Sequence, residues 1–194
     1  MSFWKFFLSC IIPFFLNAQE GYVPNALIST LKQEVVPLGK TLFEVVNFKT
    51  KKRYNVHLKG KDFVLVSVRE PGSDGRFYAV DKDGTVWLSG SVSSGAAAFR
   101  SPSGVFRILR KKKHHMSSLY PDESGMNNME YMMQFTPQGH ALHQGSVDWM
   151  SHGCIHIAPV QIKILYRWVR LGMPIVITRH SYMSFAKEDL IRIY

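Results

Sequence analysis

Cysteine is scarce in this chain of 194 residues, which contains only Cys10 and Cys154. Two cysteines close at most one disulfide, so the sequence excludes the class of small secreted domains whose folds are held by several bridges. Cys10 lies inside an apolar N-terminal run that has the character of a removable targeting segment. We therefore expect Cys154 to be the single thiol of the mature protein. An unpaired thiol is a liability in an exported protein unless it is used, which directs attention to its surroundings.

Long hydrophobic runs are also missing. The stretch Phe6–Leu16 is largely apolar, but it is shorter than the ~20 apolar residues that a membrane-spanning helix needs. Lys5 precedes the stretch and Asn17 and Ala18 follow it, which is the pattern of a secretory signal peptide. We expect residues 1–18 to be such a signal, cleaved near Ala18, and the protein to be exported. An uncleaved N-terminal anchor is the alternative.

Acidic residues are few relative to basic ones. The chain has 14 Asp and Glu against 24 Lys and Arg, a formal charge of +10 at pH 7, and its densest basic run is Arg110–His115. A cationic protein attracts polyanions. Because the expected signal peptide favours export, we expect no nucleic-acid partner and consider anionic wall polymers or a membrane surface instead. A positive surface that serves only solubility is the alternative.

Short apolar stretches separated by turn signals predict a mainly β domain. We expect strands over Leu42–Val46, Arg53–Leu58, Phe63–Val68, Arg76–Val80, Thr85–Leu88 and Met173–Thr178. The sequence Asp81-Lys82-Asp83-Gly84 predicts a hairpin turn, since it lacks the later ligands of a calcium loop. These features divide the chain into the signal peptide, an N-terminal segment over 19–40, a catalytic domain over 41–180, and a tail or short helix over 181–194.

Two further helices are predicted from apolar spacing. The first covers Asn25–Val36. The second begins at Pro159, which suits a first helical turn, and ends at Gly172. Its apolar stripe is expected to consist of Val160, Ile164, Trp168 and Leu171.

The stretch around Cys154 has the residue types of a nucleophilic site. A thiolate is the attacking species, so a cysteine nucleophile needs a nearby base, and His143 lies eleven residues upstream. Gly153 leaves room for a carbonyl to approach the backbone, and the N–H groups of Gly153 and Cys154 are expected to hold an oxyanion. Ser151 is expected to fix the local turn through its hydroxyl group.

These motifs resemble the signature of the YkuD-type L,D-transpeptidases. His143-Gln144-Gly145 followed by Ser151-His152-Gly153-Cys154-Ile155 is similar to the family pattern of H-x-G, a loop, and [ST]-H-G-C with a hydrophobic residue. Two weaker matches lie upstream in the same order. The segment Ser101–Ile108 resembles the family's T-P-x-G-x-[FY]-x-I, and Met129–Phe135 resembles its Tyr-x-Met-x-Phe strand.

The resemblance implies an L,D-transpeptidase-like β-sandwich with one helix after the catalytic cysteine and short flanking helices. It also implies roles, with Cys154 as nucleophile and His143 as base. His152 is expected to shape the loop and help hold the substrate, and Tyr131 to face the substrate. His156 stands where the family usually has Arg, so a contact with a substrate carboxylate is predicted for it, with packing beneath the loop as the alternative. No cofactor and no metal are expected.

The function implied is that of an exported cysteine acyltransferase in the periplasm or cell envelope of a bacterium. Such enzymes act on peptidoglycan stem peptides. The sequence does not specify the acceptor of the acyl group, and a wall-anchored protein is one candidate. Trimming of the same stems by an L,D-carboxypeptidase or endopeptidase is the nearest alternative. A zinc hydrolase is another, because five possible ligands cluster in sequence: His140, His143, His152, Cys154 and His156. A non-catalytic wall-binding protein is the third.

Overall fold

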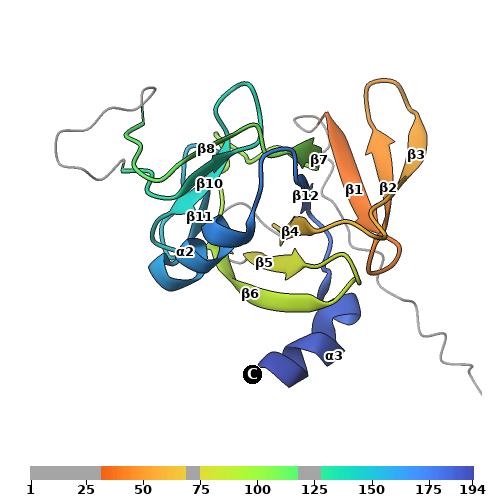
Figure 1. Cartoon of the computed structure of the whole chain (residues 1–194). Coiled ribbons are helices and arrows are strands. Elements are labelled where there is room, and N and C mark those ends of the chain that lie inside the picture. Colours follow the sequence, from red (N-terminus) through yellow and green to blue (C-terminus); the bar gives the residue numbers. More distant parts are fainter. Residues whose placement is uncertain (1–31, 69–74, 118–127) are drawn as a thin grey trace, which may run out of the picture.

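A strongly curved sheet forms the body of the molecule (Figure 1). The computed structural model describes residues 32–68, 75–117 and 128–194, and within these ranges the sheet contains nine strands. In spatial order they are β7 (Gly104–Arg107), β12 (Pro174–Thr178), β4 (Phe63–Ser67), β5 (Gly75–Val80), β6 (Val86–Ser93), β11 (Ile155–Ile157), β10 (Ala141–Gln144), β9 (Met132–Gln134) and β8 (Arg110–Lys112). Two neighbouring pairs, β12 with β4 and β10 with β11, are parallel. The predicted signal peptide, including Cys10, lies outside the described residues.

A second, three-stranded sheet packs on the first. It consists of β1 (Gln33–Pro37), β2 (Leu42–Asn47) and β3 (Arg53–His57). Its buried side chains, among them Val35, Phe43 and Val45, share a core with Phe63 and Val176 of the large sheet. The predicted mainly β, two-sheet fold is therefore confirmed.

The helix predicted over Asn25–Val36 is wrong in its described part. Residues from Gln33 onward form β1, and all five residues of this strand pair with β2. The spacing of apolar residues suited a helix, but cross-strand pairing and burial of Val35 between the sheets decide the structure. The remainder of the predicted helix lies outside the described residues. The predicted domain boundary at residue 40 falls between β1 and β2, which belong to one sheet.

A buried carboxylate joins the two sheets. Glu34 of β1 is 3% exposed, and its Oε1 accepts hydrogen bonds from the Ser103 hydroxyl at 3.0 Å and from the Arg179 backbone N–H at 2.9 Å. The hydrogen bonds to Oε1 offset part of the cost of burying this polar group. The strand β1 is thus held against the ends of β7 and β12.

The helix α2 (Pro159–Trp168) begins at the predicted Pro159, but it ends four residues before the predicted Gly172 and presents a different side to the sheet. Its buried residues are Ile162 and Leu165, continued by Val169, whereas Val160 is 66% exposed and Leu171 is 65% exposed. The predicted stripe of Val160, Ile164, Trp168 and Leu171 is therefore wrong, except that Trp168 packs edge-to-face on Trp87. Both stripes have helical spacing, and the backbone entering from β11 selects the buried one.

The C-terminal helix α3 (Met183–Ile193) was predicted and lies along β6 (Figure 1). The predicted strands are also observed, with one extension. β6 continues from Val86 to Ser93 into a stretch of small residues, because it pairs on one edge with β5 and on the other with β11. Among the helices that are described, none has the length and apolar character to cross a membrane.

Candidate active site

The parallel pairing of β10 and β11 brings the motif residues together. Leu142 lies opposite Ile155 in the register, and both side chains belong to the core beneath α2. His143 lies opposite His156, so alternation along the strands directs these two imidazoles to the other face of the sheet. Cys154 precedes β11 and lies two residues before His156, so the same alternation directs its side chain to the face that His143 occupies.

The thiol of Cys154 is half-buried in an apolar setting. It packs against Met129, Met132 and Ala141, and its Sγ lies 3.9 Å from the carbonyl oxygen of Gly139. Burial raises the pKa of the Cys154 thiol above its ordinary value, and a backbone hydrogen bond from Ala141 opposes this shift. The resting sulfur is therefore a neutral thiol near pH 7.

The imidazole of His143 is 7% exposed and has a fixed orientation. Its Nδ1 lies 2.8 Å from the carbonyl oxygen of Gln144. A carbonyl only accepts, so Nδ1 carries the proton and Nε2 carries the lone pair. Burial, aided by the neighbouring His156, lowers the pKa of His143 to about 3 against the opposing effect of the Gln144 carbonyl. The side chain is thus a neutral acceptor, oriented by a backbone carbonyl.

The turn before Cys154 is held by Ser151. Its hydroxyl donates to the carbonyl oxygen of Cys154 at 2.6 Å and accepts from the backbone N–H of Gly153 at 3.0 Å. The predicted local role of Ser151 matches this geometry. The same contacts disagree with the prediction that the Gly153 N–H holds an oxyanion, because that donor is already used by Ser151.

Gly153 is required at its position by conformation and by space. Its φ of +109° lies in a region that L side chains rarely adopt. A Cβ atom there would lie 2.9 Å from Cδ2 of His140 and 3.3 Å from the carbonyl oxygen of Phe99. The imidazole of His140, whose Nδ1 is 2.8 Å from the Thr136 hydroxyl, thereby covers the α-carbon next to the nucleophile.

Ser101 supports the same turn from the side of β7 and was not predicted to do so. Its hydroxyl is 1% exposed, donates to the Gly153 carbonyl at 2.9 Å and accepts from the Gly95 backbone N–H at 3.1 Å. The guanidinium of Arg179 donates to the Ser101 carbonyl at 2.5 Å. The sequence signal was present in Ser101–Ile108, but it was interpreted only as the start of a strand.

His156 makes its contacts within the protein. Its Nδ1 lies 3.0 Å from the Ser146 carbonyl and 3.2 Å from the Trp149 carbonyl, and its ring meets His143 edge-on at 4.9 Å between centroids. Burial lowers the pKa of His156, although the two carbonyls act in the opposite direction. Gly145 is needed beside it, since a Cβ there would lie 2.6 Å from Cγ of His156. These contacts support the packing alternative, and the predicted carboxylate contact stays a prediction.

Two other predicted residues, His152 and Tyr131, make ring contacts within the protein. The His152 side chain is exposed and packs edge-to-face on Phe99, with ring centroids 4.8 Å apart. Tyr131 contacts Tyr166 of α2 at 5.5 Å between centroids and packs on the core beneath that helix. These contacts place the Tyr131 side chain on the α2 side of the sheet, and its contact with a substrate stays a prediction.

The five possible zinc ligands do not converge. His143 and His156 direct Nδ1 to backbone carbonyls, His140 directs it to Thr136, and His152 rests on a phenyl ring. In the ranges that the structure covers, no group of three or more His, Cys, Asp or Glu side chains gathers around one point. The arrangement therefore favours a thiol with an adjacent imidazole over metal chemistry.

Comparisons with known proteins identify the family of the chain and similar folds. Residues 62–177 match the YkuD family, described as the L,D-transpeptidase catalytic domain. The fold is similar to an L,D-transpeptidase (Yku) from Stackebrandtia nassauensis, with a TM-score of 0.51 and 22% identity over 60% of this chain and 55% of that one. The chain thus spans 55% of the length of that protein.

Two further solved structures have a TM-score of 0.50. One is an L,D-transpeptidase from Mycobacterium tuberculosis H37Rv, with 15% identity over 76% of each chain. The other is a cysteine-to-serine mutant of the Enterococcus faecium L,D-transpeptidase, with 20% identity over 73% of this chain and 68% of that one. No curated protein matches the sequence. The family match covers more than half of the chain, and the chain therefore belongs to the YkuD family of L,D-transpeptidase catalytic domains.

Proposed function

We propose that this protein is an exported cysteine acyltransferase that performs L,D-transpeptidation on peptidoglycan stem peptides. The observation that carries the proposal is the parallel pairing of β10 with β11, which places His143 opposite His156 and beside the segment of Cys154, the residue that precedes β11, with the Nε2 lone pair of His143 available as a base. Membership of the YkuD family supports the substrate class. The exported location is supported by the N-terminal sequence pattern and by the place where such substrates occur.

The reaction runs through a thioester. Sγ of Cys154 attacks the carbonyl carbon between an L- and a D-centre of the stem, while its proton passes to Nε2 of His143. The imidazolium then protonates the departing amine of the D-residue, and the acyl group stays on sulfur. An acceptor amine attacks the thioester, His143 takes its proton, and the thiol is restored. Transfer to an amine gives a cross-link or anchors a wall protein, whereas transfer to water gives trimming.

The pKa values of the two groups favour a coupled proton transfer. A raised thiol pKa and a lowered imidazole pKa both disfavour a resting thiolate–imidazolium pair. His143 therefore acts as a general base during the attack and does not hold Cys154 as a thiolate before the substrate binds. Its low pKa keeps the imidazole unprotonated across neutral and mildly acidic pH.

The proposal is tested by trapping the thioester. Purified protein is mixed with a donor tetrapeptide stem, quenched in acid and weighed by intact-mass spectrometry. We expect an adduct equal to the donor minus its terminal D-residue, located on Cys154 by peptide mapping. An adduct on another residue would refute the cysteine mechanism. Consumption of the stem peptide without any adduct would refute it as well.

Alkylation of Cys154 is predicted to have a simple pH dependence. Because the thiol pKa is raised, the thiolate fraction grows throughout the neutral range, by about tenfold per pH unit. The rate of iodoacetamide labelling between pH 6 and 8.5 should follow this slope without a plateau. A plateau with an inflection below pH 7 would instead indicate a preformed ion pair.

Ser101 is proposed as a positioning residue for the nucleophile. Ser101→Ala removes the hydroxyl that joins the Gly95 N–H to the Gly153 carbonyl, and an error of 1 Å in such geometry costs on the order of 10²-fold in rate. We expect kcat to fall by about tenfold or more with KM nearly unchanged. Ser101→Thr keeps the hydroxyl and should restore most of the rate. A change confined to the melting temperature would assign Ser101 a purely structural role.

A further inference from the structure

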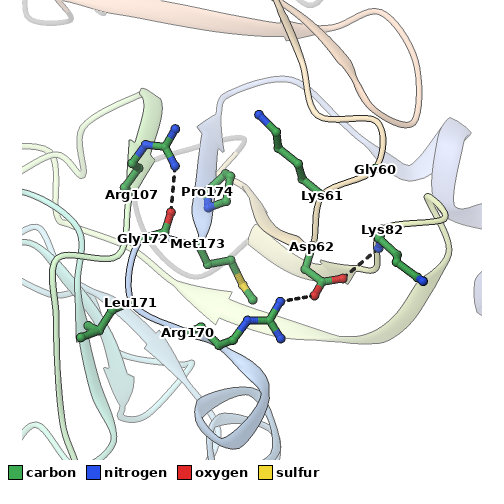
Figure 2. A pocket seen from close by; sticks show the side chains of 10 residues that line it. All are labelled: Gly60, Lys61, Asp62, Lys82, Arg107, Arg170, Leu171, Gly172, Met173 and Pro174. Carbon is green, nitrogen blue, oxygen red and sulfur yellow. Dashed lines mark hydrogen bonds and ion pairs between the residues drawn. The ribbon is translucent and has the colours of Figure 1, made fainter.

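A positively charged pocket lies away from Cys154, at the margin of the large sheet (Figure 2). Its volume is about 420 Å³, within the range of about 300–1,000 Å³ typical of ligand pockets. Four of its ten lining side chains are cationic and one is acidic. The lining consists of Gly60, Lys61, Asp62, Lys82, Arg107, Arg170, Leu171, Gly172, Met173 and Pro174.

Sheet topology places this pocket at the opposite end from the thiol. β4 and β12 are parallel, and both begin at the pocket, next to Asp62 and Met173. β6 leaves the same end after the turn that contains Lys82, and its far end pairs with His156 and Ile157 of β11. Cys154 immediately precedes β11. A ligand in the pocket therefore does not compete with a stem peptide at the thiol.

Hydrogen bonds between the segments hold the pocket in shape. The Gly60 N–H donates to the Lys82 carbonyl at 3.1 Å, which joins the turn before β4 to the turn before β6. The Gly172 N–H donates to the Ile108 carbonyl at 2.8 Å, and Arg107 Nη1 donates to the Gly172 carbonyl at 3.0 Å. The segments that carry the cations are thus fixed relative to one another before any ligand arrives.

Asp62 joins two of the segments that line the pocket. Its Oδ1 accepts from the Lys82 backbone N–H at 2.9 Å and its Oδ2 from Arg170 Nη2 at 2.5 Å. The Asp62 side chain is 18% exposed, whereas that of Arg170 is 68% exposed. The carboxylate is therefore engaged, while the guanidinium is held in place and stays accessible. With four cations and one carboxylate, 4 − 1 leaves the lining with a formal charge of +3.

The cationic groups are accessible. Lys61, Lys82 and Arg107 are exposed, and none of them has an ion-pair partner in the described part of the chain. Gly60 and Gly172, both with φ of +78°, have no atom within 4 Å of the point where a Cβ would lie. These two glycines have no side chains that would narrow the entrance of the pocket, so an anion can reach the cations from solvent.

We propose that this pocket binds phosphate groups, as a site separate from the catalytic one. Arginine presents a rigid fork of N–H donors that matches phosphate oxygens, and lysine supplies a point charge. The cations come from four segments around the rim, which suits several negative charges on one ligand better than a single carboxylate. A phosphate-bearing chain or an array of phosphate head groups provides such charges. Binding there would retain the enzyme near an anionic part of the envelope.

The experiment measures binding of inorganic polyphosphate to the purified full chain at low and at physiological salt. The pocket variant is Lys61→Gln/Lys82→Gln/Arg107→Gln. The matched control, Lys49→Gln/Lys52→Gln/Lys187→Gln, removes three exposed lysines of the β2–β3 turn and α3. We expect the pocket variant to weaken Kd by about tenfold or more and the control by less than about twofold, since local cations contribute more than net charge. Thioester formation should be unchanged in both variants, so a failure of binding is distinguishable from a failure of the proposed function.

Two further ligands identify the source and the specificity. Vesicles containing phosphatidylglycerol whose binding is lost in the pocket variant would assign the phosphates to lipid head groups, and polyphosphate binding alone would assign them to a soluble chain. Three results would each overturn the proposal. The pocket variant and the control could be weakened equally, the wild type could fail to bind polyphosphate at low salt, or polyglutamate could bind as tightly as polyphosphate. If Arg107→Gln lowers the melting temperature, Lys61→Gln/Lys82→Gln gives the same comparison without removing the hydrogen bond between Arg107 and Gly172.

Discussion

Replacement of Cys154 by Ser is expected to reduce turnover of a stem peptide by on the order of 10⁴-fold or more, as for removal of a nucleophile from other acyl-transfer sites. A hydroxyl is far less ionised than a thiol, and the half-buried apolar setting of Cys154 disfavours the charged form further. The measurement is the release of the D-residue from a tetrapeptide stem under saturating substrate. Thermal unfolding of the variant should stay within a few degrees of the wild type.

The decisive comparison uses Cys154→Ala, which removes the nucleophile without supplying another. This variant should form no covalent adduct and still bind the stem. Iodoacetamide should inactivate the wild type, and donor stem should slow that inactivation. Full activity in Cys154→Ala would refute the assignment of the nucleophile.

Replacement of His143 by Ala is the second large effect that we expect. Loss of general acid–base help typically costs about 10²–10⁴-fold in rate. Because the resting pair is neutral, iodoacetamide labelling of Cys154 should change little in this variant, whereas kcat should collapse. A large loss in both quantities would instead mean that His143 holds a thiolate before substrate arrives.

A matched control for His143 is His152→Ala. His152 is exposed and rests on Phe99, so its loss should alter KM more than kcat. His143→Ala also removes a buried hydrogen bond to Gln144 and should lower the free energy of unfolding by about 1–3 kcal/mol, which thermal unfolding would detect. A nearly silent His143→Ala together with an inactive His152→Ala would exchange the proposed roles of the two residues.

The sequence was sufficient to predict the positions of most strands along the chain and the motif that lies at β10 and β11. Alternation in stretches such as Arg53–His57 and the turn at Asp81–Gly84 are local signals, and the structure follows them. The pairing of His143 with Cys154 on one sheet face was anticipated through the family resemblance. Composition and periodicity alone contain no information about the parallel register that aligns them.

The errors arose where tertiary contacts decide between local alternatives. In α2 two apolar stripes have helical spacing, and only packing under the sheet selects Ile162 and Leu165 over Val160. In β1, pairing with β2 overrides helical spacing. The Gly153 N–H was predicted to be available, but the hydroxyl of Ser151, two residues earlier, accepts its hydrogen bond. Ser101 supports that turn from 52 residues upstream of Gly153, and the motif in Ser101–Ile108 does not reveal this contact without the fold.

The central claim is that Cys154 and His143 together transfer an acyl group between peptidoglycan stems. The most direct measurement is mass spectrometry of purified disaccharide–tetrapeptide fragments incubated with the protein. We predict loss of the terminal D-residue and the appearance of either a cross-linked dimer or a trimmed stem, with neither product formed by Cys154→Ala. Fragments that stay intact with the folded wild-type protein, or products that form equally with Cys154→Ala, would contradict the account.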